Sequence, residues 1–183
     1  MTNTDVRTAG VGVCLLPNLT KLIEAGLSQS SLLPAYGGES AGLDLINAGP
    51  DLIIPACRDF DFLSSQGETG QQWQNFYFKT LMPTGIKVAI PRGFVGLIQE
   101  RGSIVKSVLK VRAGVIDPGY TGEVFVNMVN LSSTTTTIKA GEKSPFQLIV
   151  VPALSYNLVS DEDYNSFTLD SKRQSGQIGS SDK

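Results

Sequence analysis

The chain has 183 residues, of which 41% are hydrophobic and 17% are charged, and its formal net charge is −2. These values are typical of one globular domain, and they exclude a broad basic surface for binding nucleic acid polymers, although a single nucleotide could still bind. Because the chain contains no histidine, Ser-His and Cys-His nucleophile pairs are excluded, and proton transfer near neutral pH needs a carboxylate, Lys, Tyr or water.

The two cysteines, Cys14 and Cys57, lie far apart and have no second Cys or His nearby. This spacing predicts neither a disulfide framework nor a zinc site, and we expect two thiols that are at least half-buried. No apolar run approaches the roughly 18 residues of a membrane span, and the N-terminus lacks the order of a signal peptide. We therefore expect a soluble, intracellular, cytoplasmic protein.

Short strands and one helix are predicted before residue 57. Residues 11–16 read as a strand, and Asn18 can then cap a short helix that ends at Gly26, because apolar residues repeat on one face between them. A loop rich in Ser, Gly and Pro leads to the stretch 40–45, which reads SAGLDL and contains Asp44. A solvent-facing acid at the start of a strand is the simplest interpretation of Asp44.

The middle of the chain alternates strands with turns. Strands are predicted at 51–54, 75–81, 86–90 and 94–99, and the Gly-, Gln- and Ser-rich stretch 58–74 is predicted to be a surface loop. The strand 94–99 runs to Glu100 and then to Arg101-Gly102-Ser103. An arginine there suits a phosphate or a structural carboxylate, and the alternative is an Arg that only extends its charge to solvent at a strand end.

Residues 113–124, AGVIDPGYTGEV, predict a strand, a tight Asp117-Pro118-Gly119 turn and a second strand, which together form a hairpin. A further strand is predicted at 124–129, and packed layers could cover both of its faces. Two more strands are predicted: an exposed one at 131–137, which is rich in threonine, and a buried one at 146–154. The tail after residue 160 is first acidic and then rich in Gly and Ser, which is typical of a frayed terminus.

Five stretches resemble, in order, the five motifs of the trimeric dUTPases. The stretch 114–122 is similar to motif three, GVID-x-x-Y-x-G, and is the most specific; SAGLDL resembles motif one. The stretches 101–103, 141–149 and 173–181 resemble motifs two, four and five with departures: Gly102 stands in the place of a serine, Lys143 in the place of a frequent arginine, and Ile178 in the place of a phenylalanine.

The resemblance implies an all-β, jelly-roll-like sandwich or barrel with one short helix and a mobile C-terminal tail. Residues 1–160 would form the β domain, with 58–74 as a surface insertion, and residues 161–183 would form a tail that closes over the active site. It also implies a homotrimer in which several subunits build each site.

The activity implied by the resemblance is hydrolysis of dUTP to dUMP and pyrophosphate, which limits uracil in DNA and supplies dUMP. Asp117 would orient and deprotonate the water that attacks the α-phosphorus. The implied cofactor is Mg²⁺, held with help from Asp44, mainly through water, since this ion keeps several waters and needs few carboxylates.

The implied substrate contacts fall into three groups. Tyr120 would pack beneath the deoxyribose and leave no room for a 2′-hydroxyl, and the backbone of Gly114, Val115 and Ile116 would read uracil. The remaining substrate-binding residues are Arg101, Gly102 or Ser103, Gln147, Arg173, Ile178, Gly179 and Ser180.

Two other functions are compatible with the sequence. The related dCTP deaminases carry a catalytic glutamate ten residues after the turn aspartate, where this chain has Asn127. The second alternative is a regulatory binding protein that keeps the nucleotide pocket and engages a partner protein through the insertion 58–74.

Overall fold

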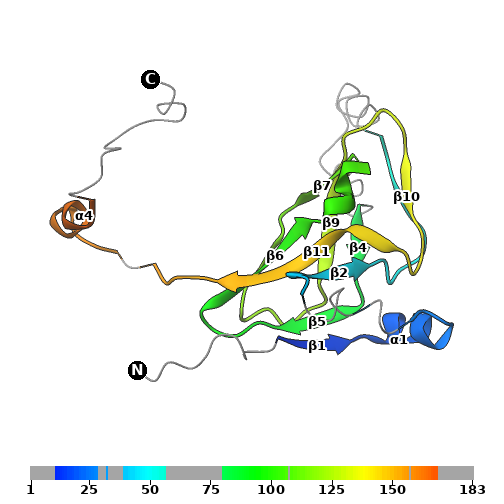
Figure 1. Ribbon diagram of the computed structural model, residues 1–183, viewed down its shortest axis with the longest axis horizontal. Helices are drawn as coiled ribbons and strands as arrows, with labels where there is room; N and C mark the ends of the chain where they lie inside the picture. Colours follow the sequence, from blue (N-terminus) through cyan, green and yellow to red (C-terminus); the bar gives the residue numbers. More distant parts are fainter. Residues whose placement is uncertain are drawn as a thin grey trace, which may run out of the picture. The chain divides into compact units, whose positions relative to one another are not determined.

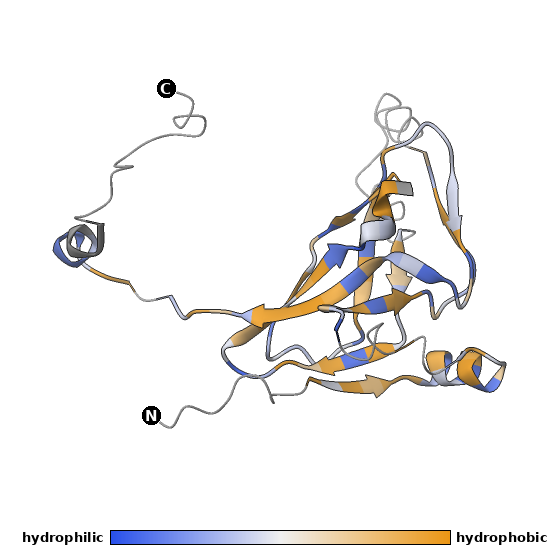
Figure 2. Cartoon of the chain, in the orientation of Figure 1, coloured by the Kyte–Doolittle hydropathy of each residue, from blue (hydrophilic) through white to orange (hydrophobic). Residues whose placement is uncertain are grey.

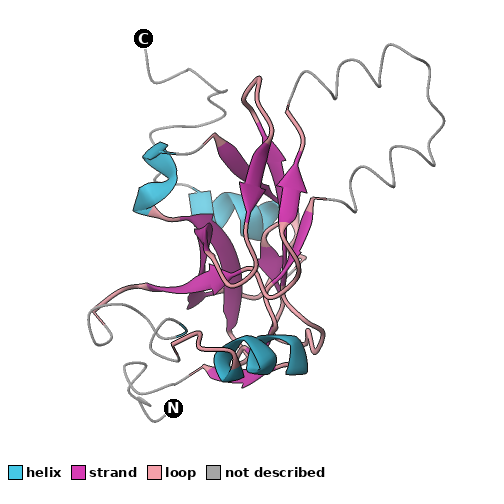
Figure 3. Cartoon of the chain, turned by 90° about the vertical axis from the view of Figure 1, so that its right-hand side faces the viewer, coloured by secondary structure: helices cyan, strands magenta, loops and turns pink. Residues whose placement is uncertain are grey.

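The computed structural model describes residues 11–28, 32, 39–56, 80–106, 108–156 and 158–168. The chain divides into two units, Met1–Ala153 and Leu154–Lys183. The first unit contains all described strands and is mostly β-structure (Figures 1 and 3), which confirms the predicted fold class. The predicted insertion 58–74 and residue Cys57 lie outside the described residues, as does most of the predicted strand 75–81.

The described strands of the first unit form four antiparallel sheets. A four-stranded sheet has the order β2 (Gly42–Ile46), β11 (Lys143–Pro152), β6 (Phe94–Glu100) and β8 (Val115–Ile116). A three-stranded sheet has the order β4 (Leu81–Pro83), β9 (Phe125–Asn130) and β7 (Leu109–Arg112). Two strand pairs complete the set: β1 (Gly12–Leu15) with β5 (Ile86–Ala89), and β3 (Leu52–Ile54) with β10 (Thr136–Ile138).

Strand β11 organises the four-stranded sheet, because it pairs with β2 on one side and with β6 on the other (Figure 1). Side chains along the strands alternate between the core and the surface, as the period of two requires. On β9, for example, Val126 and Met128 are buried while Phe125 is exposed, so this strand has one buried face and not the two that its sequence allows. Apolar residues are accordingly concentrated on the strands (Figure 2).

The hairpin predicted around Asp117 is wrong, because its two strands do not pair with each other. The turn is present, and the Tyr120 N–H donates to the Asp117 carbonyl at 3.0 Å. The strand before it, β8, pairs with β6, whereas the strand after it, β9, pairs with β4 and β7 in a different sheet. Strand β8 is therefore an edge of its sheet in the described part of the chain.

The predicted N-terminal helix is confirmed as α1 (Pro17–Glu24), with its N-cap two residues earlier than expected. Leu16 is the N-cap, not Asn18, and Pro17 occupies the first turn, where its missing N–H costs nothing. Gly26, at φ 110°, ends the helix, with the Leu27 N–H on the Leu22 carbonyl. Cys14, just before the helix, is exposed, contrary to the expectation of a half-buried thiol.

Other differences concern short elements. The threonine-rich stretch forms a strand only at Thr136–Ile138, and β7 and the 3-10 helix η4 (Gly102–Lys106) were not predicted. In the second unit a helix, α4 (Asp161–Thr168), begins where Ser160 accepts the Asp163 N–H at 3.1 Å, an N-cap that the Ser-x-x-Asp spacing could have indicated. None of the described helices is long and apolar enough to cross a membrane.

A buried asparagine joins the loops at one end of the first unit. The Asn47 amide donates to the carbonyls of Pro50 and Ile138 at 2.8 and 3.0 Å, and its oxygen accepts the Gly49 N–H at 3.0 Å. Asn47 is fully buried, and its bond to the Ile138 carbonyl is buried as well, so this carbonyl would lose its side-chain partner away from water without the asparagine.

The Asn47→Ala variant is expected to lower the free energy of unfolding by about 1–3 kcal/mol, since it leaves the buried Ile138 carbonyl and two part-buried backbone groups without their side-chain partner. Chemical denaturation compares it with Thr20→Ala, which removes one exposed hydrogen bond to the Leu16 carbonyl and should cost less than about 1 kcal/mol. Equal effects of the two substitutions would show that the asparagine does not hold these loops.

Candidate functional site

Three charged side chains form an ion-pair cluster at one side of the four-stranded sheet. The Asp44 carboxylate receives the Arg101 Nε at 2.8 Å on Oδ1 and the Lys143 Nζ at 3.1 Å on Oδ2. Asp44 is 11% exposed, and Arg101 and Lys143 are 26% and 37% exposed. Two cations against one carboxylate leave a net charge of +1, so the ion-pair cluster is suited to an anion such as a phosphate.

The cluster depends on an irregularity in β11. The pairing of β11 with β2 shifts between Lys143 and Gln147, which face Ile46 and Asp44 respectively. At this irregularity the Ser144 hydroxyl donates a hydrogen bond to the Leu45 carbonyl at 2.8 Å. Arg101 donates from Nη1 to the Ser144 carbonyl at 3.0 Å, and so the same side chain binds both the strand and Asp44.

Gln147 pairs with Asp44 of the cluster, and its side chain lies against Gly42 of β2. Its Nε2 donates to the Glu100 carbonyl at 3.1 Å, and a Cβ added at Gly42 would overlap its Oε1. Position 42 therefore has to be glycine for the glutamine to lie here. The amide keeps one hydrogen and its oxygen for a substrate, as the predicted role of Gln147 needs.

Gly102 and Ser103 begin η4 directly after Arg101, and both are exposed. Their short helix is tied to Arg101, whose carbonyl accepts the Ile104 N–H at 2.9 Å. The backbone of Arg101 is itself fixed, because its N–H donates to the Pro145 carbonyl at 2.9 Å. Both predicted phosphate donors of this stretch thus stand beside the ion-pair cluster.

Asp117 lies at the exposed end of β8, on the turn to Tyr120. The strand before the turn approaches β6 closely: a Cβ at Gly114 would stand 2.8 Å from the Ile98 carbonyl oxygen, and the Ile98 N–H donates to the Gly114 carbonyl at 2.7 Å. Because β8 is an edge strand, backbone N–H and C=O groups on its open side are accessible. Val115 is 62% exposed, and Ile116 points into the core.

Tyr120 stands on the same turn and is 43% exposed. Its hydroxyl donates to the Glu123 carbonyl at 2.7 Å. The ring lies across Gly122, where an added Cβ would stand 2.8 Å from the ring carbon that bears the hydroxyl. The exposed carboxylate and the aromatic ring are therefore presented together by one short loop.

The ion-pair cluster and the Asp117 turn lie at different positions along β6. Ile116 pairs with Gly96, whereas Arg101 follows the end of that strand, five residues later. Five residues of strand span roughly 16 Å, and the antiparallel chain moves farther from Arg101 after Ile116. Within one chain the Asp117 carboxylate and the Arg101 guanidinium consequently do not reach the same atom.

No three His, Cys, Asp or Glu side chains form a metal site in the described part of the chain. Each oxygen of Asp44 already faces a cation, which opposes direct coordination of a metal ion there. The free lone pairs of the carboxylate still allow contact through water. A cation at this carboxylate would therefore be contacted through water and not by direct coordination.

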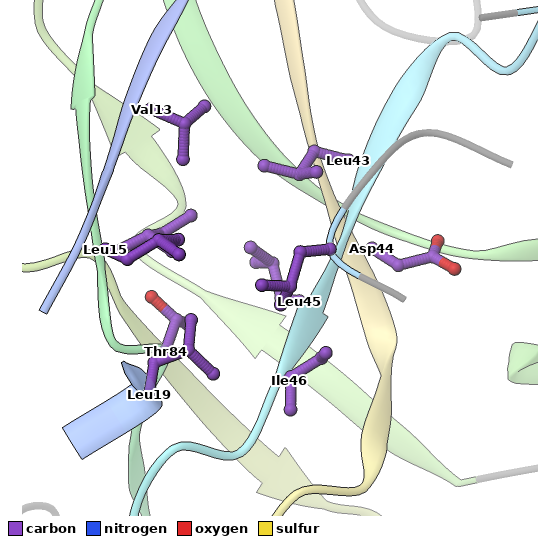
Figure 4. A pocket seen from close by; sticks show the side chains of 10 residues that line it. Val13, Leu15, Leu19, Leu43, Asp44, Leu45, Ile46 and Thr84 are labelled. Carbon is purple, nitrogen blue, oxygen red and sulfur yellow. The ribbon is translucent and has the colours of Figure 1, made fainter. Parts of the chain in front are cut away.

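An apolar pocket lies on the opposite face of β2. Its lining includes Val13, Leu15, Leu43 and Leu45, and Figure 4 shows the Asp44 carboxylate pointing away from it. The pocket offers no cluster of charged donors to a triphosphate. We therefore place the candidate site on the ion-pair cluster and the Asp117 turn.

The other predicted positions divide into two groups. Asn127 lies on β9, and its Oδ1 is 3.5 Å from the Thr80 hydroxyl; an amide cannot act as the general base that a deaminase needs. Four predicted substrate-binding residues lie outside the described residues: Arg173, Ile178, Gly179 and Ser180.

Comparisons with known proteins point to one family. The dUTPase family model matches residues 72–182. The deoxyuridine 5′-triphosphate nucleotidohydrolase of Wolbachia pipientis subsp. Culex pipiens is 33% identical over 154 residues, which cover 81% of this chain and 86% of that protein.

Two solved structures share the fold. A mutant dUTPase of Staphylococcus bacteriophage 80alpha, solved with dUpNHpp, has a TM-score of 0.63 at 22% identity and covers 95% of this chain and 99% of its own. A mutant dUTPase of S. aureus phage phi11, described with a structural Mg(II) ion, has a TM-score of 0.56 at 20% identity. The match covers 86% of this chain and 99% of that one. With the family match over most of its length, this chain belongs to the dUTPase family.

Proposed function

We propose that the protein hydrolyses dUTP to dUMP and pyrophosphate through attack of water on the α-phosphorus, and so supplies dUMP and limits uracil in DNA. The observation that carries this proposal is the exposed Asp117 carboxylate beside Tyr120, on a loop that follows the open edge of β8. A carboxylate in this place can orient the attacking water and accept its proton.

The backbone of Gly114, Val115 and Ile116 reads the base in this proposal. An edge strand offers N–H and C=O groups in a fixed pattern, and cytosine would leave some of them unpaired. The Tyr120 ring packs beneath the deoxyribose and excludes a 2′-hydroxyl by contact. The pairing of β8 with β6 supports this role, because it fixes the positions of the N–H and C=O groups that would bind the base.

The ion-pair cluster binds the phosphates. Arg101, with Gly102 or Ser103 next to it, supplies charge and donors, and Gln147 supplies its remaining amide hydrogen. Mg²⁺, when bound, neutralises charge on the triphosphate, and Asp44 contacts it through water. The main task of Asp44 in the free protein is to hold Arg101, as its 2.8 Å ion pair indicates.

Each site is built from several copies of the chain, in a homotrimer. The separation of about 16 Å along β6 supports this part of the proposal, because one protomer does not bring Asp117 and Arg101 to the same atom. The tail from residue 161 then closes over the nucleotide with Arg173, Ile178, Gly179 and Ser180. Glycine N–H groups and the arginine would cover the phosphates as the tail closes.

Pyrophosphate release with dUTP, dCTP, dTTP and UTP, with and without Mg²⁺, tests the proposed function. We expect rapid release from dUTP alone, and faster release with Mg²⁺ than without it. Ammonia release from dCTP would instead indicate a deaminase. Equal hydrolysis of all four nucleotides would contradict the proposed recognition of base and sugar.

A further inference from the structure

The position of the Tyr120 ring is set by the backbone of the two residues that follow Thr121. The ring lies against Gly122, and the hydroxyl donates to the Glu123 carbonyl at 2.7 Å. A movement of residues 122 and 123 would therefore move the ring as well.

The Glu123 side chain connects the loop to a rigid turn between β4 and β5. Its Oε1 accepts the Gly85 N–H at 2.8 Å, and the side chain is half-buried. A hydrogen bond to a carboxylate is stronger than one between neutral groups. Glu123 thus holds the loop through its side chain while its own carbonyl holds Tyr120.

Gly85 is itself unable to move freely. Its φ is 68°, and a Cβ added there would stand 2.5 Å from the Leu19 Cβ of α1. Its carbonyl accepts the Leu16 N–H at 2.7 Å, at the start of the same helix. Helix α1 therefore supports the turn on which Glu123 is anchored.

The chain after Glu123 is fixed by different groups. The Val124 carbonyl accepts the Thr84 hydroxyl at 2.6 Å, and the Val124 N–H donates to the Ile86 carbonyl at 2.9 Å. These contacts hold the start of β9 whether or not Glu123 keeps its carboxylate. Removing that carboxylate should consequently loosen the loop before β9 and leave β9 in place.

We propose that Glu123 is a positioning residue for discrimination between deoxyribose and ribose, acting through the Gly85 N–H and the Tyr120 hydroxyl. The proposal rests on the proposed function, in which the Tyr120 ring excludes the 2′-hydroxyl. A ring held at two points rejects the larger sugar by contact, and a ring that can shift makes room for it.

The test compares kcat/KM for dUTP with kcat/KM for UTP. Glu123→Ala should lower the dUTP-to-UTP ratio about tenfold, mainly through better use of UTP, the loss expected for one charge-assisted hydrogen bond. Glu123→Gln keeps an acceptor oxygen and should restore the ratio to within about threefold of the wild type. Asp51→Ala is the matched control, since Asp51 also accepts a backbone N–H, that of Ala140 at 2.9 Å, and should leave the ratio unchanged.

Tyr120→Phe keeps the ring and removes its hydroxyl without touching the Gly85 anchor, so it should lower the ratio in the same direction even if Glu123→Ala does not fold. An unchanged ratio in Tyr120→Phe, or in a folded Glu123→Ala variant that still hydrolyses dUTP, would overturn the positioning role. A wild-type protein without dUTP hydrolysis would overturn the proposed function itself.

Discussion

Asp117→Asn is expected to lower kcat for dUTP hydrolysis by about 10²–10⁴-fold, the usual contribution of a general base. Asparagine has nearly the same size and can still accept a hydrogen bond from water, but it cannot take the proton. Because Asp117 is exposed and sits on a turn, the substitution should not disturb the core. Steady-state kinetics give kcat, and calorimetry with a non-hydrolysable dUTP analogue should show binding close to that of the wild type.

Asp51→Asn serves as the control for Asp117→Asn, since Asp51 is also an exposed aspartate of the first unit. It should keep kcat within about twofold of the wild type, as expected for an exposed residue that is not part of the proposed site. Full activity of Asp117→Asn would contradict the assignment of the general base.

Arg101→Ala is expected to lower kcat/KM by about 100-fold or more, because it removes a charged donor from the phosphates and releases Asp44 from its closest partner. Arg101→Lys keeps the charge, but a single ammonium cannot reproduce both the Nε contact with Asp44 and the Nη1 contact with the Ser144 carbonyl. We therefore expect only partial recovery in Arg101→Lys.

Lys110→Ala is the matched control for Arg101→Ala, since Lys110 makes a looser, exposed ion pair with Glu100 at 3.5 Å. Exposed pairs of this kind contribute little, and kcat/KM should stay within about twofold of the wild type. Similar losses for Lys110→Ala and Arg101→Ala would show that the general surface charge matters and not the ion-pair cluster.

Mixing the two inactive variants tests whether the site is shared between copies. If Asp117 and Arg101 of each site come from different chains, co-refolded Asp117→Asn and Arg101→Ala subunits should recover up to about one quarter of wild-type activity, the statistical share of sites with both residues intact. If one chain supplies both residues, no mixed assembly has an intact site, and activity should stay at the level of the variants alone.

Local signals in the sequence predicted much of the fold. Apolar stretches bounded by turn residues predicted β5 and β6 nearly to their ends, and Gly26 correctly marked the end of α1. These features depend on neighbours in the chain, so a single sequence is enough to reveal them.

Long-range pairing could not be predicted in the same way. The Asp117-Pro118-Gly119 turn fits a hairpin, but β9 finds its partners β4 and β7 elsewhere in the chain. The ion-pair cluster likewise depends on the register between β2 and β11, which joins Asp44 to Lys143 across 99 residues. The resemblance to the dUTPases indicated Asp44 as a residue near a metal, and only the structure revealed its two cationic partners.

A structure of the assembled protein with a non-hydrolysable dUTP analogue tests the central claim most directly. The predicted result is an Asp117 carboxylate within hydrogen-bond distance of a water in line with the α-phosphorus, with Tyr120 against the deoxyribose and Arg101 of another copy on the phosphates. A nucleotide bound away from the Asp117 turn, or a carboxylate directed away from the α-phosphorus, would contradict the account.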